Sequence, residues 1–165
     1  MRLTPIVLTL AIAAATMASA GQSQRPDDQI DPRSTALVQQ AQTQSAAGRF
    51  DEANDLLETA LAVDPRNRAA FVTMARVAMK QKLFGQAIRL TNKALQLEPT
   101  DRDALSVQGT AMVELGADAR AKEVLAKLQK VCTSGCPQLA ELNAAITRGP
   151  TLAQAKSPAG TPKKN

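Results

Sequence analysis

Residues 60–65 read Ala-Leu-Ala-Val-Asp-Pro, and residues 94–99 read Ala-Leu-Gln-Leu-Glu-Pro, 34 positions further along the chain. The correspondence extends backwards, because Phe50 and Ala53 stand 34 positions before Phe84 and Ala87. A fixed period of this length is typical of proteins built from stacked pairs of helices. Each pair in such an array covers the apolar face of its neighbour. The sequence therefore predicts an all-α fold made of repeated two-helix units.

The apolar residues inside each unit recur with a helical period. In the first unit they form a stripe on a helix that Asp64-Pro65 should end, since proline cannot continue the backbone hydrogen-bond ladder; the stripe consists of Ala53, Leu56, Leu57, Ala60 and Leu61. Glu98-Pro99 predicts the same ending one unit later. We expect units at about 34–67, 68–101 and 102–131, followed by a capping helix at 137–148 that begins with Pro137.

Both ends of the chain differ in composition from the repeats. Residues 1–20 have a basic start, an apolar run and a final Ala-Ser-Ala, which predicts a signal peptide cut after Ala20; an uncleaved anchor is the alternative. Residues 21–33 are predicted to be a flexible leader and 149–165 a disordered tail. We therefore expect a periplasmic or secreted protein without a transmembrane span.

The composition excludes several classes of function. The chain has no His, which removes the commonest general base and the usual triads and metal sites. It has no Trp or Tyr, and its charges of both signs are interspersed, so a nucleic-acid surface is not expected. We predict no enzyme activity, cofactor, metal or small-molecule substrate.

Two cysteines, Cys132 and Cys136, lie between the third unit and the capping helix. In an oxidising compartment such a pair is most often a structural disulfide. Free thiols and redox or metal chemistry are the alternatives, although two thiolates alone cannot fill a tetrahedral zinc shell.

The repeated residues resemble the tetratricopeptide repeat. Large apolar residues, small residues at the helix crossings and a closing proline agree with that family. They are Ala53, Leu57, Ala60 and Pro65 in the first unit, Phe71, Met74, Ala75, Ala78, Ala87, Ala94 and Pro99 in the second, and Leu105, Gly109, Met112, Ala121 and Leu125 in the third, where the closing proline is missing. The resemblance implies a right-handed α-solenoid of about three repeats plus the capping helix. A helical bundle without solenoid stacking is the alternative.

In this family the first helices of successive repeats line a concave groove that takes a peptide or a partner helix. The resemblance places eight residues there by position: Val38, Gln42, Val72, Arg76, Met79, Lys80, Ser106 and Thr110. Arg76 and Lys80 lie one turn apart and could contact an anion, or simply be solvated charges. Members that clamp a C-terminal carboxylate have Lys and Asn where this chain has Val38 and Gln42.

These observations favour a noncatalytic exported scaffold that binds a protein or peptide of the cell envelope. The alternative is a structural subunit that associates with itself or joins a larger envelope or secretion assembly. Mixed surface charge and a capping helix favour a monomer.

Overall fold

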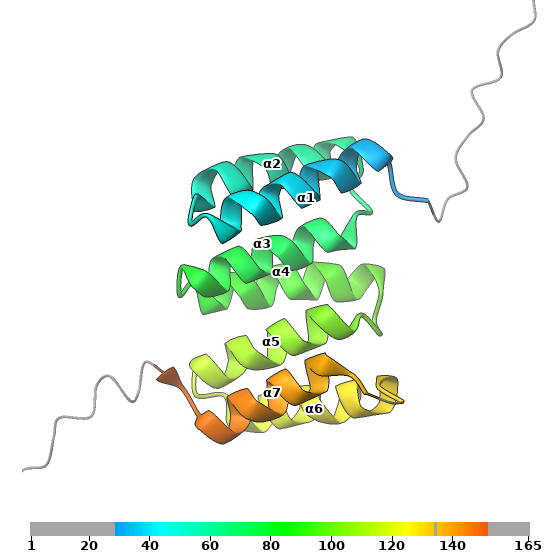
Figure 1. The fold of residues 1–165 in the computed structure, drawn as a ribbon. Helices are drawn as coiled ribbons and strands as arrows, with labels where there is room; N and C mark the ends of the chain where they lie inside the picture. Colours follow the sequence, from blue (N-terminus) through cyan, green and yellow to red (C-terminus); the bar gives the residue numbers. More distant parts are fainter. Residues whose placement is uncertain (1–28, 134, 152–165) are drawn as a thin grey trace, which may run out of the picture.

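The computed structural model describes residues 29–133 and 135–151, and within them it contains seven helices and no strand. The helices stack as a ladder (Figure 1). The first helices of the units and the last helix form one layer, namely α1 (Pro32–Ala46), α3 (Arg68–Lys80), α5 (Arg102–Glu114) and α7 (Pro137–Arg148). The second helices form the other layer, namely α2 (Phe50–Val63), α4 (Phe84–Leu97) and α6 (Asp118–Val131). The predicted all-α solenoid of helical repeats is confirmed.

The turn inside each of the three units contains a residue with left-handed backbone at the same repeat position. Gly48 and Gly116 have φ angles of 78° and 71°, and Lys82, at the equivalent position of the second unit, has a φ of 60°. Left-handed backbone of this kind is comfortable for glycine and strained for other residues. Asp64 and Glu98 end α2 and α4 in extended conformation, one residue before a proline, as the sequence predicts.

Small residues let the helices of each unit pack closely. Ala53, Ala87 and Ala121 occupy the same repeat position, and all three are completely buried. Larger apolar side chains fill the remaining space, and those of Leu57 and Leu128 are completely buried. Burying one such leucine stabilises the fold by about 1.5–3 kcal/mol. The core is therefore a continuous row of small clusters along the ladder, and it has no single centre.

The first helix is held by polar contacts where larger apolar residues are missing. The Ser34 hydroxyl donates to the Ala60 carbonyl at 2.7 Å, and the Asn67 amide donates to Ser34 Oγ at 2.7 Å. The Asp31 backbone N–H donates to Asp64 Oδ2 at 2.9 Å. This bond, with further bonds from Arg66, holds the pKa of Asp64 below its usual value despite burial.

The first helix starts earlier than the sequence pattern indicated. We predicted a leader through residue 33, but α1 begins at Pro32. The reason is local: Asp31 caps the helix by accepting from the Arg33 N–H at 2.8 Å, and Pro32 suits the first helical position.

Several sequence predictions fall outside the described residues. These are the signal peptide at 1–20, the leader up to residue 28 and the tail from residue 152. Among the helices of residues 29–133 and 135–151, none is long and apolar enough to cross a membrane.

Candidate functional site: the concave groove

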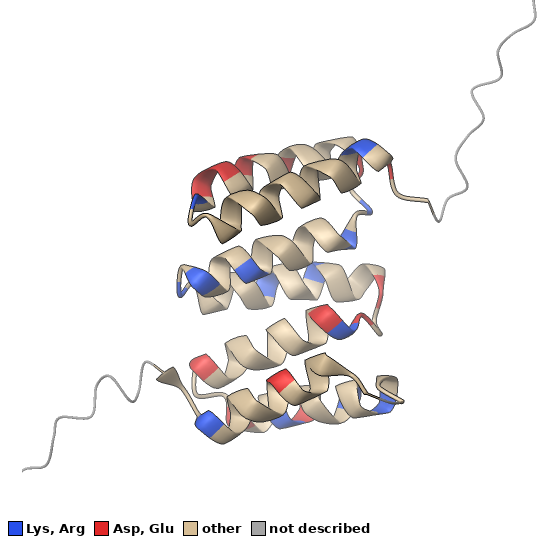
Figure 2. Ribbon diagram, viewed as in Figure 1, with Lys and Arg blue, Asp and Glu red and all other residues tan. Residues whose placement is uncertain are grey.

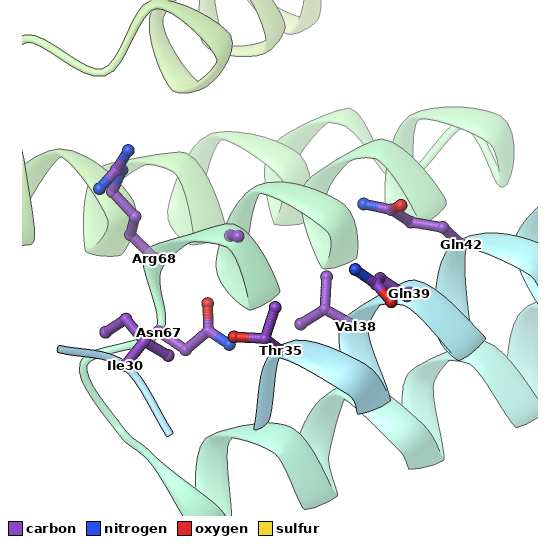
Figure 3. A pocket seen from close by; sticks show the side chains of 8 residues that line it. Ile30, Thr35, Val38, Gln39, Gln42, Asn67 and Arg68 are labelled. Carbon is purple, nitrogen blue, oxygen red and sulfur yellow. The ribbon is translucent and has the colours of Figure 1, made fainter. Parts of the chain in front are cut away.

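The layer of first helices carries a groove between α1 and α3. Its largest hollow has a volume of about 350 Å³ (Figure 3) and is lined by Ile30, Thr35, Val38, Gln39, Gln42, Asn67, Arg68 and Ala69. Two smaller hollows of about 130 and 280 Å³ follow along α3, and the smaller of them also reaches Asp101 and Asp103 at the start of α5. Gln42 lines all three hollows, which makes them parts of one groove.

The groove follows the helical period of the sequence. Val38 and Val72 lie 34 positions apart, and each side chain is only 4% exposed, so the two valines form an apolar floor. One turn further on, Gln42 and Arg76 also lie 34 positions apart and are exposed at the groove wall. With Lys80, which lines the same hollow as Gln42 and Arg76, the structure brings together five of the eight residues that the resemblance placed in the groove.

Arg76 and Lys80 both have partners within the protein. Arg76 donates to Asp103 Oδ1 at 2.8 Å, which forms an ion pair between α3 and α5. The Lys80 ammonium donates to the Ser45 carbonyl at 3.0 Å and to Ser45 Oγ at 3.1 Å. A cation at this place also suits the negative end of the α1 dipole. Both side chains still line the hollow that contains Gln42 and Thr73.

The third unit contributes less to the groove because α7 covers α5. Ser106 is only 3% exposed and lies 3.4 Å from Glu141 of α7, so its assignment as an open groove residue is wrong for this arrangement. Gly109 makes the approach possible: a Cβ atom there would lie 2.6 Å from Leu142 Cδ1. Thr110 is half-buried, and Met79 packs against the cluster around Phe84. The widest part of the groove is therefore the space between α1 and α3, and its narrow part reaches the start of α5.

Some groove residues escaped the sequence reasoning. Arg68 borders both the largest hollow and the smallest, and its Nε lies 2.5 Å from Asp101 Oδ2. Ile30 and Asn67 lie outside the predicted first helices but reach the same hollow. The sequence predicts that these residues lie at or just before the beginnings of helices. Only the packing of two units against each other shows that they border a groove.

The cysteine pair lies away from the groove. Cys132 and Cys136 are at disulfide distance, with their Cα atoms 5.6 Å apart, in the segment that joins α6 to α7. Within the described part of the chain, no group of three or more Cys, Asp or Glu side chains is placed to hold a metal ion.

The ladder of helix pairs and its concave groove define a helical-repeat protein. Residues 45–108 match the sequence model of the tetratricopeptide repeat family. The match supports the resemblance to tetratricopeptide repeats for residues 45–108. No curated protein matches it in sequence.

Solved structures of similar fold include three tetratricopeptide repeat domains. The first domain of Spaghetti (RPAP3), bound to the HSP90 peptide SRMEEVD, is 22% identical over 75% of this chain and 97% of that one, with a TM-score of 0.64. The Sgt2 domain from Aspergillus fumigatus is 20% identical over 82% and 89%, with a TM-score of 0.64. The TPR2B domain of yeast Sti1, in its pHsp70 complex, is 16% identical over 72% and 98%, with a TM-score of 0.65. At these identities the likeness shows the fold.

Proposed function

We propose that this protein is a noncatalytic exported scaffold whose groove between α1 and α3 binds an extended segment of a cell-envelope protein. The observation that supports it most is the continuity of three hollows through Gln42. Structural neighbours that carry bound peptides agree with this role, since one binds the HSP90 peptide SRMEEVD and another is in a pHsp70 complex.

The lining of the groove suggests which peptide it suits. Val38 and Ala69 offer an apolar surface in the largest hollow, where an apolar side chain would lose contact with water. Gln42 and Thr73 can both donate to and accept from the peptide main chain. Lys80 uses two bonds to Ser45, and an ammonium group has three hydrogens, so one remains for a carboxylate of the ligand. An apolar residue followed by an acidic one therefore fits this groove.

A filled groove provides the test. Ala69 is exposed on α3 and borders two of the hollows, so Ala69→Tyr would occupy the groove without entering the core. Ala62 is exposed on α2, in the opposite layer, and Ala62→Tyr is the matched control. Peptides selected from a displayed random library against the wild-type protein should lose at least about tenfold in affinity with Ala69→Tyr and none with Ala62→Tyr. Equal binding by both variants, or no selected peptide, would refute the proposed groove.

Export is a separate part of this proposal. It is supported by the composition of residues 1–20 and by a cysteine pair at disulfide distance, which is compatible with an oxidising compartment. Fractionation of producing bacterial cells should give a protein outside the cytoplasm whose N-terminal residue is Gly21. A cytoplasmic product that still begins with Met1 would contradict export but would not bear on the proposal that the groove binds a peptide.

A further inference from the structure

The turn inside each unit and the end of α7 lie along one edge of the ladder (Figure 1). We call this the turn edge, and it consists of residues 47–49, 81–83, 115–117 and 149–151. Large apolar side chains are exposed on it, because Leu83 is 46% exposed and Leu115, in the neighbouring turn, is 52% exposed. Among the residues that the structure describes, the other exposed large apolar side chain is that of Leu97, at the end of α4 and on the opposite edge. Two of the three such side chains therefore lie on the turn edge.

The turn between α3 and α4 is the basic part of this edge. Lys82 is exposed and has left-handed backbone where the other two units have glycine. Strained backbone of this kind is concentrated at functional sites. The two neighbouring turns are followed by exposed carboxylates, Asp51 and Glu52 in α2 and Asp118 in α6, whereas α4 contains no acidic residue. Figure 2 accordingly shows blue at the turn between α3 and α4 and red at the beginning of α2.

The chain leaves the described structure at the same edge. Glu114 is only 8% exposed, and its carboxylate accepts from the Thr151 N–H at 2.9 Å and from the Thr151 hydroxyl at 2.6 Å. Since Leu115 follows Glu114 directly, residue 152 begins close to this exposed leucine. Residues 152–165 include three lysines and no Asp or Glu. Fully extended, this stretch reaches at most about 50 Å, so its lysines can contact a surface that covers the turn edge.

We propose that the turn edge docks on an anionic lipid surface. Leu83 and Leu115 enter the headgroup region, and Lys82 and the lysines after residue 152 contact the lipid phosphates. A lipid surface suits these leucines better than a folded protein does, because they protrude from separate turns and line none of the hollows described above. A fluid surface adapts to single side chains and needs no preformed hollow. This docking goes beyond the proposed function, and it leaves the groove between α1 and α3 uncovered.

Fluorescence reports the contact directly, because the chain has no Trp or Tyr. Leu83→Trp and Leu115→Trp each place a single indole on the turn edge, and Leu97→Trp is the matched control on the opposite edge. Mixed vesicles of phosphatidylglycerol and phosphatidylcholine should shift the emission of the first two variants to shorter wavelength, since the indole enters the lipid interface. The emission of Leu97→Trp should not change. Pure phosphatidylcholine vesicles should shift none of the three.

Partitioning measures what each group contributes. The protein as purified from producing cells should bind the mixed vesicles at least about tenfold more strongly than pure phosphatidylcholine vesicles. The double variant Leu83→Ser/Leu115→Ser should lose about tenfold in binding, because its two turns no longer bury a leucine in the lipid, and Leu97→Ser should lose none. Lys82→Gln should lose about fivefold, whereas Lys93→Gln, at an exposed position in the middle of α4, should lose nearly nothing.

The controls separate docking of the turn edge from other attachments. Every variant carries the same N-terminus, so attachment through residues 1–20 would be common to all of them. Three results would overturn the proposal: no preference for the anionic vesicles, equal losses by the turn-edge and control leucine variants, or binding with unshifted emission at both Leu83→Trp and Leu115→Trp. The last result would show attraction to anions of any kind, including an acidic protein. Ala69→Tyr, which fills the groove, should bind the vesicles as wild type does, so this proposal and the proposed function fail separately.

Discussion

The approach of α7 to Gly109 makes a sharp prediction about one methyl group. An alanine Cβ at this position would lie 2.6 and 2.7 Å from the two Cδ atoms of Leu142 and 3.2 Å from its Cγ. Leu142 is completely buried and has no open space to enter. Overpacking of this kind costs about 1–3 kcal/mol. Alanine has a higher helix propensity than glycine, and this difference stabilises the protein by up to about 1 kcal/mol. We expect Gly109→Ala to lower the free energy of unfolding by about 1 kcal/mol, the difference between these two effects.

Gly85 is the matched control, because it is the other glycine within a described helix. A Cβ there would meet only Arg89 Nη1, at 4.0 Å. Gly85→Ala should therefore be neutral or stabilise the protein by up to about 1 kcal/mol, less than in mid-helix because it lies in the first turn of α4. Urea unfolding followed by circular dichroism gives both values. If Gly109→Ala proves as stable as Gly85→Ala, the argument from close approach is wrong.

The double variant separates a clash from other causes. Leu142→Ala alone should cost about 2–5 kcal/mol, because it leaves a cavity beneath α7. Adding Gly109→Ala to that variant fills part of this cavity. The loss in the double variant should therefore be smaller than the sum of the two single losses. Additive losses would show that Gly109 and Leu142 do not restrict each other.

Three further variants probe other contacts. Asp64→Asn should lower the free energy of unfolding by about 1.5–3 kcal/mol at neutral pH, because it weakens the bond from the Asp31 N–H. The pKa of Asp64 is lowered in the folded protein, so the stabilisation by its carboxylate is present above the unfolded pKa and is lost as the pH falls through the folded pKa. Urea titrations of wild type and variant at acid pH should therefore give free energies of unfolding that converge. Lys82→Gly should stabilise the protein by about 1 kcal/mol in urea unfolding, since Lys82 has a positive φ where its equivalents are glycines, and an unchanged midpoint would speak against strain there. Replacing Cys132 and Cys136 by serine should cost about 2 kcal/mol and speed amide exchange in residues 137–148 without unfolding the repeats, and unaltered exchange would count against a stapling role.

Much of the fold was readable in the sequence because the repeat period carries it. The prolines at 65 and 99 and the alanines at 53, 87 and 121 sit where close crossings and helix ends require them, so the helix pairs follow from local chemistry. The start of α1 was missed because the Asp31 cap lies before a proline that also suits a leader.

The candidate site was less predictable, because it depends on contacts between units. Nothing in the sequence near Arg76 shows that its partner is Asp103, 27 positions away on another helix. The burial of Ser106 likewise follows from the close approach of α7 to α5, which requires that Gly109 has no side chain. Repeat position identified Val38, Gln42, Val72, Arg76 and Lys80 as residues that line the hollows, and it failed for Met79, which packs against the Phe84 cluster, and for Ser106, which α7 covers.

The pairing of Arg76 with Asp103 has a consequence for how quickly a ligand is captured. Arg76 has its counterion Asp103 at 2.8 Å, and Arg68 is likewise paired with Asp101, so both arginines project little electric field into solvent. At physiological ionic strength what remains is screened within about 8 Å. These two arginines therefore do little to draw a ligand in from a distance, and Lys80 is the groove cation that can do so. Variants of Arg68 or Arg76 should leave the association rate of a ligand and its dependence on salt nearly unchanged.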